Sequence, residues 1–363
     1  MVSPHTHEES RKEMHTIYIF GLGPSSLDQM PKGLYDRIIN EELVYLRTLE
    51  HPAARELKDL GLRIKSFDSV YEKYEENFEE VYKEIVHQLK GKVEDKDVYY
   101  GVPGHPAVAE TTVQRLLAEE IKVEIIGGKS FIDDLFAAVA IDPINGFQLM
   151  DSFDLNADHI YPGNQLIVMQ VFNSFMASEV KLALMEIYPA EHEVAFIDAA
   201  GSADEKVKWL PLYELDYFEG VYNLRSLYVP ALTRDEAIYS FSTLKSYMDE
   251  IFGETGDVWA KKQTGSSLLK HFQEELDELK DAYQKDDLEN VVEELGDLLM
   301  QIFYQAALGE KEELFSLEEI VAGINQKLRR RHPHVFDNVK AETPEEVDAI
   351  WQAIKEKEKR GEI

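Results

Sequence analysis

The sequence contains no cysteine, no apolar run long enough to cross a membrane, and far fewer cationic than anionic side chains. The absence of cysteine excludes disulfides and thiolate metal sites. With 38 Lys and Arg against 70 Asp and Glu, the formal net charge is −32, so most of the surface repels a nucleic-acid backbone. The polar first residues lack the apolar segment of a signal peptide. These absences predict a cytoplasmic protein with no membrane and no nucleic-acid partner.

A chain of 363 residues is long enough for more than one hydrophobic core. After a polar tail, residues 1–14, strand-like and helix-like segments alternate through residues 15–230 and predict an α/β domain with a mixed sheet. Residues 231–240 are expected to form an exposed linker. Residues 241–363 show only helical patterns, so the predicted fold class is a multidomain chain, an α/β domain followed by an all-α domain.

The helical part carries two groups of carboxylates at helical spacing, 274–278 and 294–297. Residues three or four apart lie on one face of a helix. If the two helices pack antiparallel through a turn at 285–287, four carboxylates meet, and their repulsion calls for a cation between them. An all-oxygen site favours Mg²⁺, which also bridges to substrate phosphates. The pattern therefore indicates Mg²⁺-dependent phosphate chemistry.

The apolar residues of these helices recur at helical spacing and are expected to face inward. In the second helix they are Leu288, Val291, Val292, Leu295, Leu299 and Ile302. An acidic face turned to solvent would give the first carboxylate group as readily in so negative a chain. The second group, and the basic segment that follows it, favour the cation site.

A third helix is predicted to begin at Ser316, which forms the pattern of a capping box with Glu319. It runs into the basic segment 327–334, KLRRRHPH. Lys327 and Arg331 lie one turn apart on the same face, where both can bind phosphate oxygens. Cations that complement the dipole of a helix C-terminus are the alternative for part of this segment.

Together these motifs resemble the MazG family of nucleoside triphosphate pyrophosphohydrolases, from about residue 241 to 359. The resemblance implies an all-α homodimer of interleaved helices that cleaves nucleoside triphosphates between the α and β phosphates, releasing a monophosphate and pyrophosphate. It implies the Mg²⁺ ligands Glu275, Glu278, Glu294 and Asp297, with Glu274 beside them to orient the attacking water. The implied substrate contacts are Lys262, Lys327, Arg331, Trp351 and Lys355.

One departure from the MazG pattern concerns the start of the domain. The family commonly has Cys-Pro-Trp-Asp there, whereas this chain has Asp257-Val258-Trp259-Ala260. The loss of the proline and of the acidic residue after the tryptophan affects base selectivity more than metal chemistry. We therefore expect hydrolysis of ordinary and non-standard nucleotides without strong discrimination.

The α/β part has glycine-rich turns after predicted strands. They are Gly21-Leu22-Gly23-Pro24, Gly101-Val102-Pro103-Gly104 and Gly127-Gly128-Lys129-Ser130. Glycine lets a backbone approach a ligand closely, and two such turns at strand ends form a crevice in an open sheet. The first turn lacks the third glycine of a dinucleotide fingerprint, and a purely structural role for these glycines stays open.

Further motifs carry a second resemblance, among them 46–48 (LRT), 51–52 (HP), 102–106 (VPGHP) and 109–110 (AE). Residues 15–230 look like the tetrapyrrole (corrin/porphyrin) methylase family, with closest similarity to its YabN-type members fused to MazG. The resemblance implies two α/β subdomains with S-adenosylmethionine between them. The implied lining residues are Gly21, Gly23, Pro24, Gly101, Pro103, Gly104, Gly127 and Ser130.

Three functions remain after these observations. The first is a pyrophosphohydrolase with a methylase-like partner domain. The second is an active methyltransferase acting on a tetrapyrrole or another methyl acceptor, with a regulatory MazG-like domain; against it, Ser25-Ser26 stands where active methylases usually carry Gly-Asp. The third is a non-catalytic scaffold, because a fold alone does not fix a function.

Overall fold

The computed structural model describes residues 15–74 and 77–362 of the chain. The expected polar tail, residues 1–14, lies outside these residues. The chain divides into two compact units, Met1–Ala237 and Ile238–Ile363. Among the helices of the described residues, none is both long and apolar enough to span a membrane.

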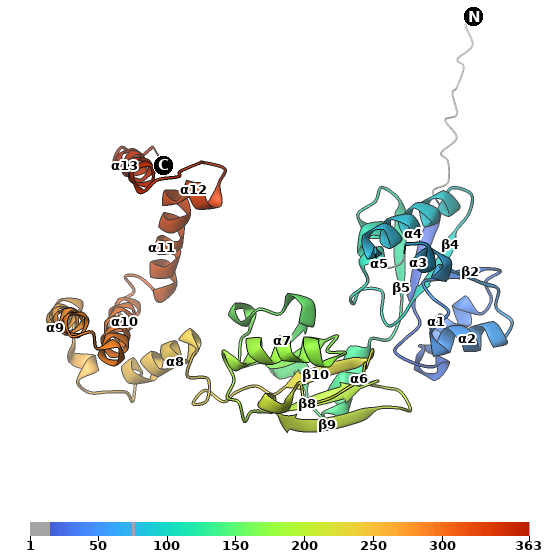
Figure 1. Ribbon diagram of the computed structural model, residues 1–363, viewed down its shortest axis with the longest axis horizontal. Helices are drawn as coiled ribbons and strands as arrows, with labels where there is room; N and C mark the ends of the chain where they lie inside the picture. Colours follow the sequence, from blue (N-terminus) through green and yellow to red (C-terminus); the bar gives the residue numbers. More distant parts are fainter. Residues whose placement is uncertain (1–14, 75–76, 363) are drawn as a thin grey trace, which may run out of the picture. The chain divides into compact units, whose positions relative to one another are not determined.

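The first unit contains two sheets (Figure 1). The first of them is entirely parallel, with strand order β3-β2-β4-β1-β5. β1 is buried along nearly its whole length, as expected of a central parallel strand covered by helices. The strands are β1 (Thr16–Gly21), β2 (Val44–Leu46), β3 (Ile64–Ser66), β4 (Val98–Val102) and β5 (Lys122–Gly127). The helices of this part are η1 (Leu27–Gln29), α1 (Lys32–Ile38), α2 (Pro52–Asp59), α3 (Asp68–Tyr74), α4 (Phe78–Val93) and α5 (Thr111–Leu117).

The second sheet is mixed, with order β6-β7-β10-β8-β9. β6 and β7 are parallel, and the other neighbours are antiparallel. The strands are β6 (Phe147–Asp151), β7 (Gln165–Met169), β8 (Glu193–Asp198), β9 (Lys206–Pro211) and β10 (Arg225–Val229). The helices are α6 (Phe131–Ala138), α7 (Ser174–Met185), η2 (Pro143–Asn145), η3 (Ser152–Asp154), η4 (Ala157–His159) and η5 (Leu212–Glu214). The mixed sheet that the sequence predicts is therefore present.

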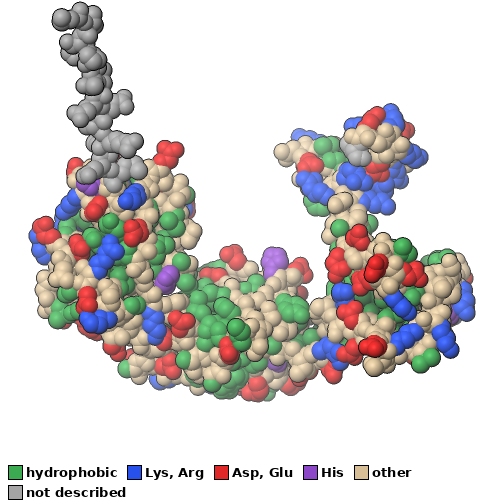
Figure 2. Space-filling view, turned by 180° about the vertical axis from the view of Figure 1, so that it is seen from behind, with side chains coloured by type: hydrophobic (Ala, Val, Ile, Leu, Met, Phe, Trp, Pro, Cys, Tyr) green, Lys and Arg blue, Asp and Glu red, His purple; other side chains and the backbone are tan. Residues whose placement is uncertain are grey.

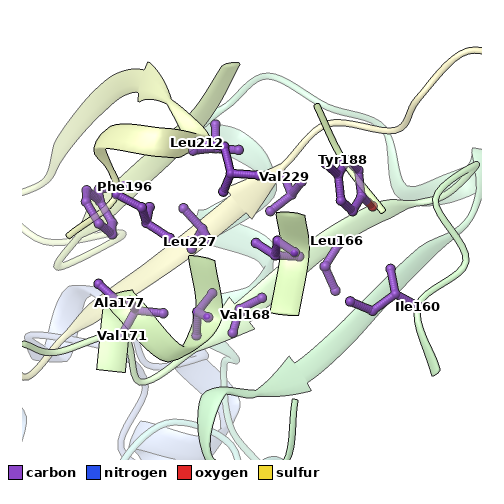
Figure 3. Packing of buried hydrophobic residues seen from close by; sticks show 14 of the residues in the cluster. Ile160, Leu166, Val168, Val171, Ala177, Tyr188, Phe196, Leu212, Leu227 and Val229 are labelled. Carbon is purple, nitrogen blue, oxygen red and sulfur yellow. The ribbon is translucent and has the colours of Figure 1, made fainter. Parts of the chain in front are cut away.

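Alternate residues of the second sheet enter two hydrophobic cores. On one face, Leu166 and Leu227 pack with Ala177 of α7, and Figure 3 shows this cluster. On the other face, Leu135 of α6 packs with Ile167. Because successive strand residues point to opposite faces, one apolar run such as β7 supplies both cores.

The second unit is helical (Figure 1). Its elements are α8 (Phe241–Phe252), η6 (Ala260–Lys262), α9 (Gly265–Gln284), α10 (Leu288–Lys311), α11 (Leu317–Arg331), α12 (Pro333–Phe336) and α13 (Pro344–Lys359). Ser316 caps α11 and forms the predicted capping box with Glu319. The chain reverses between α9 and α10 at residues 285–287, where Asp286 has a φ of 53°. The fold class, an α/β domain followed by a MazG-like helical domain, agrees with the prediction.

Several apolar side chains of α10, expected to face inward, are exposed in the single chain. Val291 is buried, but Leu288 is 74% exposed, Val292 72% and Leu295 48%. A hairpin of two helices buries the face along which the helices touch and leaves other apolar positions uncovered. Ile302 is also exposed, at 39%, so the expectation of an inward orientation is wrong for these four side chains within one chain.

Candidate active site

The carboxylates of α9 and α10 meet in the helical hairpin. Oxygen atoms of Glu275, Glu278 and Glu294 all lie within 4.8 Å of one another. Asp297, one turn after Glu294 on α10, adds its negative charge to the surroundings of Glu275 and Glu294. These four residues, called here the carboxylate group, are the set that the sequence singled out as metal ligands.

The electrostatics of the carboxylate group favour a cation. Burial raises the pKa of Glu275, and the charges of Asp297, Glu278 and Glu274 raise it further. Desolvation likewise raises the pKa of Glu294, followed by repulsion from Glu278 and Asp297. Glu275 and Glu294 therefore ionise against the negative charge of their neighbours. The donor set consists only of carboxylate oxygens, which fits a hard divalent cation such as Mg²⁺.

Glu274 lies beside the carboxylate group and has a different partner. One of its oxygens lies 2.7 Å from Nδ1 of His271, one turn earlier on α9. The ring of His271 in turn contacts the indole of Trp259 edge-on, with ring centroids 5.7 Å apart. Trp259, which precedes α9, thus contacts this helix at His271, one turn before the carboxylate residues. The sequence analysis assigned no role to His271.

A second set of predicted residues gathers where α11 ends and α13 packs. Lys327 is exposed on α11, and Arg331 is bonded to Glu358 of α13. The indole of Trp351 lies against His332, with ring centroids 5.1 Å apart, and its Nε1 is buried without a hydrogen-bond partner. Lys355 is half-buried on the same helix. We call Lys327, Arg331, Trp351 and Lys355 the α11–α13 group.

In a single chain the carboxylate group and the α11–α13 group are separate. α11 leads away from α10, and α12 and α13 lie at its far end (Figure 1). Within residues 238–362, no hydrogen bond or ion pair joins the two groups. Figure 2 shows Lys and Arg side chains concentrated at the far end of this unit. Lys262, the remaining predicted substrate contact, is exposed in η6 before α9.

In the first unit the structure brings the three glycine turns together. Gly23 and Gly104 form an isolated bridge through hydrogen bonds of 2.9 and 3.1 Å. A Cβ at Gly21 would lie 2.1 Å from the carbonyl oxygen of Gly104 and 3.0 Å from Cα of Gly128. Gly21 is therefore required for the packing of one turn on another, which is the structural role that the sequence left open.

The other glycines of these turns divide into buried and open positions. A Cβ at Gly101 would meet the side chains of Leu46 and Phe20 at 2.5–2.7 Å, so this glycine faces the core. Gly104 and Gly127 have φ values of +64° and +119°, and a Cβ there would meet nothing within 4 Å. These two positions leave room for a ligand close to the backbone, as an S-adenosylmethionine crevice requires.

The remaining residues of the predicted crevice are half-buried. They are Pro24, Pro103 and Ser130, and the Ser130 hydroxyl accepts a hydrogen bond from the backbone N–H of Ile132 at the start of α6. The loop Pro24–Ser25–Ser26 offers no carboxylate. Among the predicted lining residues, Gly104 and Gly127 are therefore positions at which the backbone is not covered by neighbouring atoms on the side of a Cβ.

Polar side chains beside these turns, buried or half-buried, form hydrogen bonds that the sequence pattern did not predict. Arg47, just after β2, donates to Glu110 at 2.5 Å and to the hydroxyl of Tyr71 at 2.8 Å. His51 lies 3.1 Å from the carbonyl oxygen of Gly23, and burial lowers its pKa. Arg47 and His51 belong to motifs that the sequence analysis quoted only for their resemblance. Their spacing along the chain gives no sign that they meet partners from other segments.

Comparison with known proteins follows the same division of the chain. Residues 16–216 match the Tetrapyrrole (Corrin/Porphyrin) Methylases, and residues 263–336 match the MazG nucleotide pyrophosphohydrolase domain. Protein YabN of Bacillus subtilis (strain 168) is 41% identical over 348 residues, which are 94% of this chain and 71% of YabN. The chain belongs to the YabN-type family. In this family a tetrapyrrole methylase domain precedes a MazG domain.

Other relatives match only one part of this YabN-type protein. The nucleoside triphosphate pyrophosphohydrolase of Escherichia coli (strain K12) is 41% identical over 106 residues, which are 29% of this chain and 40% of that protein. The crystal structure of uroporphyrin-III-C-methyltransferase from Thermus thermophilus covers 59% of this chain and 93% of its own, at 17% identity and a TM-score of 0.46. Trp351 and Lys355 lie beyond the residues that match the MazG domain.

Proposed function

We propose that the helical unit is a Mg²⁺-dependent nucleoside triphosphate pyrophosphohydrolase that converts a nucleoside triphosphate and water into a monophosphate and pyrophosphate. The observation that carries this proposal is the convergence of three carboxylates within 4.8 Å in a domain that matches MazG. The similarity to the E. coli pyrophosphohydrolase, confined to the same part of the chain, supports the substrate class.

In the proposed mechanism, Glu275, Glu278, Glu294 and Asp297 hold Mg²⁺. When bound, the ion neutralises phosphate charge and lowers the pKa of coordinated water. Glu274 stands beside the ligands and orients the attacking water, and its 2.7 Å contact with His271 holds its carboxylate in place. General-base assistance of this kind needs only hydrogen-bond reach to the water.

In this proposal, the cationic side chains of the α11–α13 group bind the substrate phosphates, together with Lys262. Arg331 offers the planar fork that suits phosphate oxygens, whereas Lys327, Lys355 and Lys262 act as point charges. The buried, unpartnered Nε1 of Trp351 is a donor suited to a polar atom of the nucleotide. In this proposal, the residues near Trp351 also contact the ribose and the base and so determine the base selectivity.

We also propose that the protein is a homodimer. Apolar side chains are exposed on α10, and on α11 Val321, Ile324 and Leu328 are each close to half exposed. Apolar rows of this extent are typical of surfaces that another chain covers. A second copy would also supply an α11–α13 group near the carboxylate group, which one chain does not do. Sedimentation velocity distinguishes a dimer from a monomer directly.

For the first unit, residues 15–230, we propose binding of S-adenosylmethionine at the glycine turns, with residues 231–240 as the linker to the helical unit. The open positions at Gly104 and Gly127 support a ligand there. Methyl transfer to a tetrapyrrole is the second candidate function, favoured by the match of residues 16–216 to the methylase family. Calorimetric titration with S-adenosylmethionine tests binding, and its failure would favour a scaffold role for this unit.

The test of the hydrolase is incubation of the purified protein with standard, deoxy and oxidised nucleoside triphosphates and Mg²⁺, with products separated by ion exchange. We expect monophosphate and pyrophosphate, whereas diphosphate and orthophosphate would contradict cleavage between the α and β phosphates. Glu278→Gln and Asp297→Asn are expected to abolish turnover. Glu289→Gln, an exposed carboxylate on α10 outside the group, is the matched control and should keep full activity.

A further inference from the structure

One carboxylate, that of Glu358, fastens α13 to the end of α11. Its Oε2 accepts from Nη2 of Arg331 at 2.6 Å, and its Oε1 accepts from Nε of Arg331 at 3.2 Å. Oε1 also accepts from Nε of Arg330 at 2.7 Å. The Glu358 side chain is only 17% exposed, although it belongs to a terminal helix of a highly charged chain. Both oxygens of this carboxylate thus accept hydrogen bonds from neighbouring guanidinium groups.

The same face of α13 carries the two residues of this helix that the proposed function assigns to the nucleotide. Trp351, Lys355 and Glu358 follow one another at spacings of four and three, which places them on one side of a helix. Trp351 contacts His332, the residue after Arg331. Fixing Glu358 to Arg331 therefore also fixes where the indole and the ammonium group stand relative to the guanidinium.

The geometry of Arg331 leaves it able to bind a second anion. Its bonds to Glu358 use Nε and Nη2, and a guanidinium has five N–H donors, so the Nη1 side is not used by this pair. When an arginine side chain is already held along one edge by a carboxylate, binding of an anion at its other edge costs less side-chain entropy than binding to a free arginine. The pairing is thus compatible with phosphate binding at Arg331.

We propose that Glu358 is the positioning residue of the nucleotide-binding half of the site: through its hydrogen bonds to Arg331 it sets the orientation of that guanidinium and the placement of Trp351 and Lys355. This inference rests on the proposed function, because it takes these three residues as the nucleotide contacts. Glu358 acts through Arg331 and does not itself touch the substrate.

A competing role for Glu358 predicts the opposite effect on nucleotide binding. If Glu358 instead occupied Arg331 in place of substrate phosphate, its removal would free the guanidinium and tighten nucleotide binding. A positioning role requires the reverse. Its loss should weaken binding and leave the chemical step nearly unchanged, because Glu358 makes no contact with the carboxylate group on α9 and α10.

The experiment uses the full chain with ATP and Mg²⁺ and compares Glu358→Gln with wild type. The amide keeps the shape and removes the charge, so we expect KM to rise about tenfold, the effect of losing one charge-assisted hydrogen bond, with kcat within about twofold. Glu356→Gln is the matched control, because it removes an exposed carboxylate of the same helix that lies outside the pair of Glu358 and Arg331. It should leave KM within about twofold of wild type.

A binding measurement keeps this test independent of turnover. Calorimetric titration with α,β-methylene-ATP and Mg²⁺ should give a Kd about tenfold weaker for Glu358→Gln than for wild type. Circular dichroism confirms that the variant retains its helices. An unchanged KM and Kd would reduce Glu358 to a structural ion pair, and a lower KM would make it a competitor; either result overturns the proposal. Wild type that binds the analogue but releases no pyrophosphate from ATP would refute the hydrolase while leaving the positioning role supported.

Discussion

Replacing Glu275 by glutamine is expected to make the helical unit more stable without Mg²⁺ and less stable with it. Without the ion, burial and three neighbouring carboxylates raise the pKa of Glu275 above its ordinary value. For an acid, a raised pKa in the folded state means that ionisation opposes folding. This opposition grows as the pH rises through the folded-state pKa and is complete at neutral pH. Glutamine removes it.

The size of the effect follows from the geometry. Two carboxylates of the group lie within 4.8 Å of an oxygen of Glu275. Coulomb's law with the dielectric constant of water gives about 0.9 kcal/mol for each pair at this distance, and salt reduces it. We therefore expect Glu275→Gln to gain about 1 kcal/mol without Mg²⁺, a rise of about 4 °C in the midpoint of the helical unit.

With Mg²⁺ the order reverses. An ion present at about a hundred times its Kd stabilises the folded state by about 2.7 kcal/mol. The Glu275→Gln variant lacks one ligand of the ion, so it loses most of this stabilisation. Differential scanning calorimetry in EDTA and in excess Mg²⁺ measures both effects on one sample. Asp281→Asn, a carboxylate exposed on α9 outside the group, is the control and should respond to Mg²⁺ as wild type does. A variant less stable than wild type in EDTA, or stabilised equally by Mg²⁺, would refute the reasoning.

Two further predictions concern the glycine turns and the end of α13. Gly21→Ala places a Cβ 2.1 Å from the carbonyl oxygen of Gly104 and should cost about 3 kcal/mol of unfolding free energy in urea, whereas Gly33→Ala, on the exposed side of α1 with nothing within 4 Å, should gain about 0.5 kcal/mol. Arg331 and then Arg330 lower the pKa of Glu358 to about 2. A carboxylate whose folded-state pKa is lowered stabilises the folded state above its ordinary pKa, and this contribution is lost as the pH falls towards 2, so the side-chain carboxyl carbon signal of Glu358 in NMR should keep its ionised position from pH 7 to about 4 and titrate with a midpoint near pH 2.

Local patterns in the sequence predicted the helical unit well because its structure depends on short-range rules. Ser316 and Glu319 form the capping box that their spacing predicts, and the chain turns at 285–287 between two amphipathic helices. The convergence of Glu275 and Glu294 followed from the same periodicity. The capping box is decided within about one turn of helix, and the meeting of the two carboxylate pairs needs only a short turn between two adjacent helices, so spacing along the chain is informative for both.

Contacts between distant segments were beyond such patterns. Periodicity marks Leu288 and Val292 as apolar-face residues, but it does not say whether that face is covered by the same chain or by another, and both are exposed here. In the same way, nothing local to Arg47 shows that Glu110, 63 residues away, is its partner. Glycine is equally ambiguous, because Gly21 packs against another turn whereas Gly127 stands open.

The proposed function requires a strongly acidic protein to bind a polyanionic nucleotide, and the arrangement of charge in the helical unit is compatible with such binding. With a net charge of −32, the chain repels a nucleoside triphosphate at long range, but in physiological salt this repulsion is screened beyond about 8 Å. Binding then depends on the charges near the phosphates. In the proposed dimer, the α11–α13 group of one copy would supply cations to the phosphates, and the carboxylate group of the other copy would hold Mg²⁺. Since the carboxylates repel phosphate unless a cation lies between them, we expect the proposed hydrolysis to require the Mg²⁺-bound nucleotide.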